Sequence, residues 1–129
     1  MGAGFTVDAR LPKELPVSDT ELCSILSNGL ENAMRAVCAL EESDRQVTFY
    51  CELKPNRLLI EICNPYAGEL VMQDGLPVSG REGHGYGCRS IRSIATQNRG
   101  LCTFDAEHGV FTLRVMIPLH GLDHEQQVR

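Results

Sequence analysis

The chain has 129 residues, which suggests a single domain that can bury a core of its own. Apolar residues make up 43% of it, so the chain should fold, and no apolar run approaches the roughly 20 residues of a membrane span. The net charge of -5 argues against a general nucleic-acid binder, and the start "MGAGFTVDARLP" lacks the basic and apolar regions of a signal peptide.

In the first third of the chain, residues 5–11 ("FTVDARL") alternate between apolar and polar side chains, which predicts a strand. A proline-containing loop follows. Ser18 or Asp19 can cap the next helix, and Glu21 would complete a capping box with Ser18. The apolar periodicity predicts that this helix runs to about Glu41.

Two strands are predicted next, at residues 46–53 and 57–63, joined by the hairpin signal "KPN". Residues 64–87 are rich in glycine and show little periodicity. A loop of this length inside a compact domain is usually functional or mobile.

A second helix is predicted at residues 88–98, with Gly100 as its C-cap. Residues 101–105 and 110–117 form a last predicted hairpin. The domain is expected to span residues 1–119, and the polar tail 120–129 is expected to fray.

The six cysteines match no known metal-binding spacing, and none forms a CxxC pair. Several fall where a strand or helix would point inward, so reduced, mostly buried thiols are expected, with a disulfide framework as the alternative. They are Cys23, Cys38, Cys51, Cys63, Cys88 and Cys102.

The stretch "NGLENAMRA" places residues that disfavour helices inside the first predicted helix. At about 100° per residue, Asn28, Asn32 and Arg35 form one column beside the apolar stripe. They can be a solvated face with a Glu31–Arg35 ion pair. Alternatively, an amide oxygen can ligate Mg²⁺ and arginine can hold a phosphate. Gly29 would let another segment approach closely.

The stretch "GREGHGYGCRSI" leads a glycine-rich turn directly into the second predicted helix. Exposed backbone N–H groups and a helix N-terminus together favour phosphate, although such a turn can also be only a loop. It matches neither a dinucleotide fingerprint nor a P-loop. His84 is interpreted as part of a lid rather than as a catalytic group.

The phrases "LCSILSNGLENAMRA", "ICNPYAGEL" and "GHGYGCRSIRSIATQNRG", in this order, make the chain resemble the GHKL (Bergerat-type) ATP-binding domain. Gyrase, histidine kinases and MutL repair proteins share this domain. Within it, the chain is similar to the catalytic domain of peptide-quorum-sensing receptor histidine kinases. The resemblance implies an α/β two-layer sandwich, a mixed β-sheet with helices on one face, and bound ATP with Mg²⁺.

Carried over by position, the resemblance implies a role for each motif residue. Asn32 would ligate Mg²⁺, Asn28 would assist through the metal's water, and Arg35 would contact phosphate. Asn64 would stand where most relatives have an Asp that binds the adenine amino group. The lid over the phosphates would be formed by Gly83, His84, Gly85 and Gly87.

Two of these positions carry further expectations. The hydrolytic relatives have a Glu where this chain has Asn28, so slow hydrolysis and phosphoryl transfer to a histidine are expected here. Glu31 is a weaker candidate for a substitute base. Asn64 can present either its oxygen to adenine or its N–H to guanine, so weak ATP binding with relaxed base selectivity is expected. Alternatively, Asn64 only caps the loop before Pro65, and the base is read by backbone and water.

The resemblance therefore implies the catalytic domain of a two-component sensor kinase. Its partners would be a separate phosphoacceptor histidine domain and a response regulator. The parent protein would be a membrane-anchored homodimer with this domain in the cytoplasm. Two alternatives remain open: a non-catalytic nucleotide-binding or dimerisation module, and a protein-serine kinase of the anti-sigma-factor type.

Overall fold

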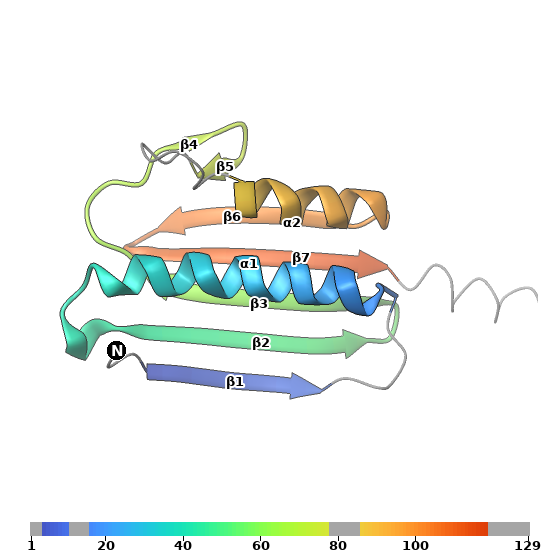
Figure 1. The fold of residues 1–129 in the computed structure, drawn as a ribbon, viewed down its shortest axis with the longest axis horizontal. Helices are drawn as coiled ribbons and strands as arrows, with labels where there is room; N and C mark the ends of the chain where they lie inside the picture. Colours follow the sequence, from blue (N-terminus) through green and yellow to red (C-terminus); the bar gives the residue numbers. More distant parts are fainter. Residues whose placement is uncertain (1–3, 11–15, 78–85, 119–129) are drawn as a thin grey trace, which may run out of the picture.

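A computed structural model describes residues 4–10, 16–77 and 86–118 (Figure 1). The chain folds into a sheet of five strands, a separate two-stranded hairpin and two α-helices. In chain order the elements are β1 (Gly4–Arg10), α1 (Asp19–Cys38), the 3-10 helix η1 (Glu42–Asp44), β2 (Gln46–Lys54), β3 (Arg57–Pro65), β4 (Met72–Gln73), β5 (Leu76–Pro77), α2 (Tyr86–Gln97), β6 (Leu101–Glu107) and β7 (Val110–Pro118).

The five strands form a mixed sheet in the order β1-β2-β3-β7-β6. The β1–β2 pair is parallel, and the other pairs are antiparallel. Both helices lie on one face of this sheet, α1 against β3 and α2 against β6 (Figure 1). This arrangement confirms the predicted α/β two-layer sandwich with helices on one face.

The helix α1 starts at the predicted capping box. Ser18 Oγ accepts a hydrogen bond from the Glu21 N–H at 3.1 Å, and a Glu21 carboxylate oxygen accepts one from the Ser18 N–H at 3.1 Å. The bond from the Ser18 N–H is the largest cause that lowers the pKa of Glu21, followed by the hydrogen bond from Asn98. The helix ends at Cys38 rather than near Glu41, because Ala39 closes it and η1 follows.

Gly29 is buried on the sheet-facing side of α1, as the apolar periodicity predicts. A Cβ atom at this position would lie 2.7 Å from Ile62 Cδ1 and 2.9 Å from Leu113 Cδ2. The glycine therefore brings α1 close to the two central strands. This contact confirms the expected close approach at Gly29.

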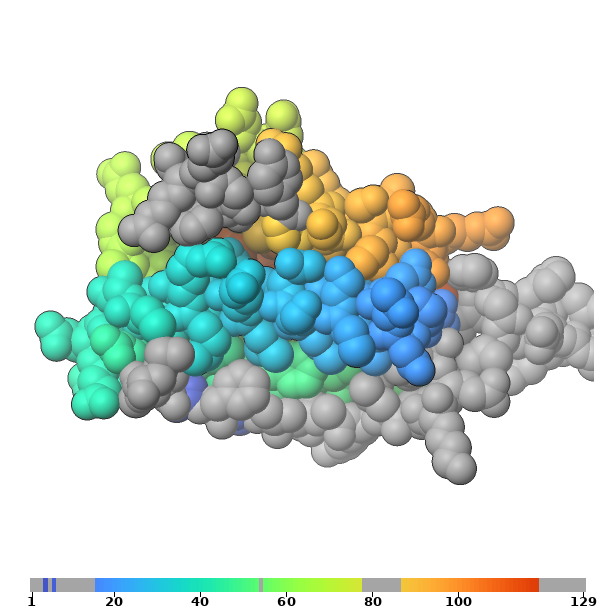
Figure 2. Space-filling model, in the orientation of Figure 1, coloured from blue at the N-terminus to red at the C-terminus, as the bar shows by residue number. Residues whose placement is uncertain are grey.

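The core lies between the helices and the sheet. Alternate side chains of β3 and β7 are buried on the helix-facing side, including Ile60 and Val115. From α2, Ile91 and Ala95 are fully buried against them. Figure 2 shows the side chains of α1 and α2 covering this face of the molecule. No helix among the described residues is long and apolar enough to cross a membrane.

The segment predicted as a continuous loop contains a short hairpin, β4–β5. Its turn residues Asp74 and Gly75 both have positive φ angles, 55° and 75°. An Asp-Gly pair in this conformation is the two-residue turn that closes tight hairpins. The segment 64–87 is therefore not a continuous loop: Leu76 of the hairpin is buried, and Met72 packs against the core.

The six cysteines are free thiols, as expected. Cys51, Cys88 and Cys102 are buried. Burial raises the pKa of Cys51 and of Cys88 to about 11, and that of Cys102 to about 12. Cys23 and Cys38 are exposed, so only part of the set matches the expected burial.

Candidate functional site

A cavity of about 70 Å³ lies beside the second half of α1, where β3 ends and β7 begins. The hairpin β4–β5 and the segment leading into it form the remaining wall. The lining residues come from four elements and the chain between them. They are Asn32, Ala36, Asn64, Tyr66, Leu70, Pro77 and Phe111.

Asn64 is the one buried polar side chain among the described residues, at 2% exposed. It stands on the helix-facing side of β3, opposite Phe111 of β7. Its Nδ2 donates a hydrogen bond to the Pro65 carbonyl oxygen at 2.9 Å. No hydrogen bond to its Oδ1 comes from residues 4–10, 16–77 or 86–118, and the amide lines the cavity.

Asn32 reaches the same cavity from α1. Its side chain is half-buried, and no described residue forms a hydrogen bond with it. Ala36 lies one turn further along the helix and lines the same cavity. The structure thus brings together two of the amides singled out from the sequence, one from a helix and one from a strand.

Asn28 lies on α1, one turn before Asn32. It packs against the start of α2 and does not line the cavity. Its Nδ2 donates to the Ser24 carbonyl oxygen at 2.9 Å and to Ser24 Oγ at 3.2 Å. A Cβ atom on Gly87 would lie 3.2 Å from Asn28 Oδ1. The glycine therefore allows the first turn of α2 to pass directly over this amide.

Arg35 is the member of the predicted column that points toward solvent. Its Nη2 lies 3.4 Å from Glu31 Oε1, and the two side chains are 38% and 69% exposed. The sequence left open that Arg35 belongs to a solvated helix face and pairs with Glu31. This i,i+4 ion pair agrees with that interpretation. Arg35 is not among the residues that line the cavity. The pair also keeps Glu31 on the outer side of the helix.

Only the C-terminal end of the glycine-rich turn lies among the described residues. Gly83, His84 and Gly85 lie outside the described residues, and Gly87 lies in the first turn of α2. Because Gly87 contacts Asn28, the end of the turn and the amide column of α1 are neighbours.

Sequence reasoning missed the apolar walls of the cavity: Tyr66, Leu70, Pro77 and Phe111. Three of them belong to the segment assigned as a loop, where periodicity carries no information. The "MQDGLP" pattern, an Asp-Gly pair between apolar residues, was the available signal for the hairpin. Phe111 was assigned to a strand, but nothing in the sequence indicated that it would face Asn64.

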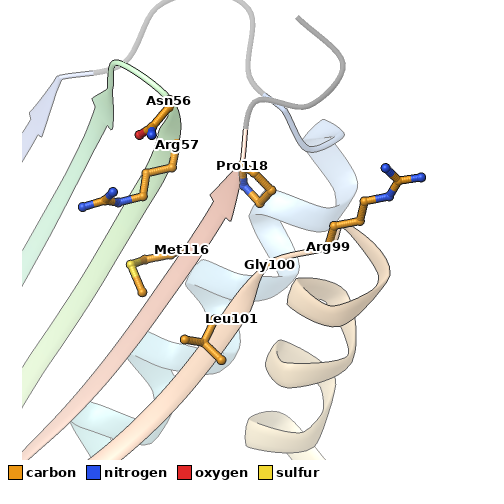
Figure 3. Close-up of a pocket in the computed structure, with 7 residues that line it drawn as sticks. All are labelled: Asn56, Arg57, Arg99, Gly100, Leu101, Met116 and Pro118. Carbon is orange, nitrogen blue, oxygen red and sulfur yellow. The ribbon is translucent and has the colours of Figure 1, made fainter. Parts of the chain in front are cut away.

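A larger cavity, of about 330 Å³, lies at the opposite end of the sheet (Figure 3). Arg57 and Arg99 are part of its lining, with Leu101, Met116 and Pro118 as its apolar part. Figure 3 shows the two guanidinium groups pointing away from each other. The larger volume therefore lacks converging polar groups, whereas the smaller cavity has two amides directed at one space.

The protein-family comparison matches residues 18–118 to the GHKL domain. The chain therefore belongs to the GHKL family of ATP-binding domains. Its fold is that of histidine-kinase catalytic domains.

The similar solved structures support that assignment of the fold. A nucleotide-free catalytic domain of the histidine kinase ThkA has a TM-score of 0.69 at 15% identity, over 91% of this chain and 80% of that chain. The histidine kinase AdeS of Acinetobacter baumannii has a TM-score of 0.70 at 12% identity, over 93% of this chain. The match spans only 56% of the AdeS chain. A search of curated protein sequences found no significant match.

Proposed function

We propose that the chain is the ATP-binding catalytic domain of a two-component sensor histidine kinase. It would transfer the γ-phosphate of ATP to a histidine on a separate phosphoacceptor domain. One observation carries this proposal: Asn32 and Asn64 present amides to the same cavity, at the position where the family motifs imply nucleotide. The base, the metal ion and the phosphates of the nucleotide would each contact a different part of this site.

The adenine base would enter the cavity between Tyr66, Leu70, Pro77 and Phe111. Its amino group would donate to Asn64 Oδ1, because Nδ2 of that amide already donates to Pro65. At about 70 Å³ the cavity is smaller than the roughly 300–1,000 Å³ of typical small-molecule sites. It therefore fits the inner, base-binding end of a nucleotide site that opens further when ATP binds.

Mg²⁺ would be held on the α1 side of the cavity. Asn32 fits this role because its amide supplies a hard oxygen ligand and has no hydrogen-bond partner among the described residues. When bound, the ion supplies charge neutralisation at the phosphates. Arg35 would exchange its exposed partner Glu31 for phosphate, at small cost because exposed pairs of this kind are worth about 0.2–1 kcal/mol.

The chemistry would be transfer rather than hydrolysis. Asn28 cannot accept a proton at neutral pH, and its Nδ2 is engaged by Ser24. Glu31 faces solvent in its ion pair with Arg35 and is a poor candidate to activate water. With neither Asn28 nor Glu31 acting as a base beside the phosphates, the domain would position ATP and stabilise charge while an external histidine attacks.

The wider assembly follows from this assignment. The domain would work in the cytoplasm as part of a membrane-anchored, homodimeric receptor. A response regulator would receive the phosphoryl group from the phosphoacceptor domain. A non-catalytic nucleotide-binding module is the second candidate, favoured by the small cavity and by the engagement of Arg35 with Glu31.

Calorimetric titration with ATP, with and without Mg²⁺, tests the nucleotide site. Binding to the wild type should strengthen when Mg²⁺ is present. Asn32→Ala should remove that dependence and weaken binding at least about tenfold, equivalent to about 1.4 kcal/mol. Unchanged affinity in Asn32→Ala would contradict the assignment of this residue, and an absence of ATP binding to the wild type would contradict the proposed function.

Binding alone does not separate the two candidates. Mixing the domain with the phosphoacceptor domain of its parent kinase and labelled ATP does so. Acid-labile label on a histidine supports the kinase. Tight Mg²⁺-dependent binding without any transfer supports the non-catalytic module.

A further inference from the structure

Arg92 of α2 contacts the turn of the β4–β5 hairpin. Arg92 Nη1 donates a hydrogen bond to the Asp74 carbonyl oxygen at 2.8 Å. A Cβ atom on Gly75 would lie 3.6 Å from the same nitrogen, so the guanidinium rests against the turn. The contact joins the middle of a core helix to the tip of a short hairpin.

The acceptor is held by the turn itself. Asp74 and Gly75 both adopt positive φ angles, 55° and 75°, which fixes the direction of the Asp74 carbonyl. Arg92 lies next to the fully buried Ile91 on α2. A guanidinium is a charged donor, and bonds from charged donors are stronger than those between neutral groups.

The same hairpin forms a wall of the Asn32–Asn64 cavity. Pro77 of β5 and Leu70, just before β4, line it, and Leu76 is buried in the core. A two-stranded hairpin of this size is marginally stable by itself. Among the described residues, the burial of Leu76, the packing of Met72 and the Arg92 contact hold it beside the cavity.

We propose that Arg92 is a positioning residue for nucleotide binding: it holds the β4–β5 hairpin closed against the base cavity without touching the nucleotide. This inference rests on the proposed function of the cavity. Without the contact, the hairpin would spend part of its time away from the cavity. The apparent dissociation constant would then rise by the reciprocal of the fraction of molecules that remain closed.

The position of the hairpin predicts how the loss of Arg92 changes the affinities for ATP and for ADP. Leu70 and Pro77 form the cavity on the side where the base would sit, together with Asn64 and Tyr66. Loss of Arg92 should therefore weaken the binding of ATP and of ADP by the same factor, about fivefold, because the bond to the Asp74 carbonyl oxygen is exposed to solvent. An arginine that touched the γ-phosphate would instead affect ATP more than ADP.

The test compares Arg92→Ala and Arg92→Lys with Arg99→Asn. The control removes an arginine just beyond the same helix, and asparagine tolerates the positive φ of 63° at that position. Hydrogen exchange of the nucleotide-free proteins should accelerate at residues 72–77 in Arg92→Ala only. Arg92→Lys should restore part of the protection, and Arg99→Asn should match the wild type in exchange and affinity.

Each arm can overturn the proposal. Unchanged exchange at residues 72–77 in Arg92→Ala would show that the contact does not hold the hairpin. Equal ATP affinity in wild type and Arg92→Ala, or a larger loss for ATP than for ADP, would exclude the positioning role. If wild type binds no ATP, the proposed function fails, while the exchange experiment still reports on the hairpin.

Discussion

Asn64 lines the cavity with its amide held in one orientation by the Pro65 carbonyl oxygen. From the sequence, its amide could face either way and accept either base. In the structure Nδ2 donates to the Pro65 carbonyl oxygen. Reversing the amide would place two acceptor oxygens together in a buried site, at a cost of roughly 1–3 kcal/mol. The acceptor Oδ1 is therefore the atom that the amide presents to a ligand.

This orientation predicts selectivity for adenine over guanine. The wild type should bind ATP at least about tenfold more tightly than GTP, which corresponds to about 1.4 kcal/mol. Asn64→Leu, with a similar shape and no acceptor, should bring the two affinities close together. Competition titrations measure both ratios, with Asn56→Leu in the exposed loop between β2 and β3 as the matched control. A wild-type ATP/GTP ratio near one would contradict the assignment of Asn64 to the base.

The same geometry predicts that an Asp at position 64 does not tighten ATP binding. Here one of its oxygens would face the Pro65 carbonyl, and burial at 2% exposure would disfavour the carboxylate. This chain accordingly has a structural reason for an amide at position 64.

At the scale of the elements, α1 shows why poor helix formers persist in a helix. Asn28 packs under the start of α2 through Gly87, and Asn32 faces the cavity. Gly29 is retained for packing, because Ile62 and Leu113 occupy the space that a side chain would need. The helix begins at a capping box and covers the central strands, so it tolerates these residues.

Gly29→Val should therefore destabilise the protein. The added methyl groups would overpack the interface between α1 and the sheet, which typically costs about 1–3 kcal/mol. Ser27→Val introduces the same side chain on the exposed face of α1 and should change stability by less than about 0.5 kcal/mol. Urea unfolding of both variants measures the difference. Equal stabilities would show that the glycine is not required for close packing.

The length of an element decides whether its hydrophobic pattern can predict it from the sequence. The strands β3 and β7 alternate between buried and more exposed positions, and their pattern predicted them within a few residues. The hairpin β4–β5 has only two residues in each strand, too few for periodicity to register. The apolar half of the cavity depends on that hairpin and on contacts across the fold, so it was not predicted.

For the molecule as a whole, the buried thiols link stability to pH. Burial raises the pKa of Cys51 to about 11 and that of Cys102 to about 12, from the ordinary value of 9.0. Between these values the unfolded chain loses protons that the folded protein keeps. The free energy of unfolding should therefore fall as the pH rises from about 9 toward 11.

Urea unfolding at a series of pH values from 8 to 11 measures this loss. A variant with Cys51, Cys88 and Cys102 all changed to alanine should be less stable at pH 8 but show a shallower decline. An identical decline in both proteins would mean that other groups carry the pH dependence.

The most direct test of the nucleotide site compares the two cavities at opposite ends of the sheet. Backbone amide signals should be followed by NMR while Mg²⁺ and ATP are added. Signals of Asn32, Asn64, Tyr66 and Phe111 should shift, and those of Asn56, Leu101 and Met116 should not. Shifts confined to the Arg57–Arg99 end, or no shifts at either end at millimolar nucleotide, would contradict the nucleotide site.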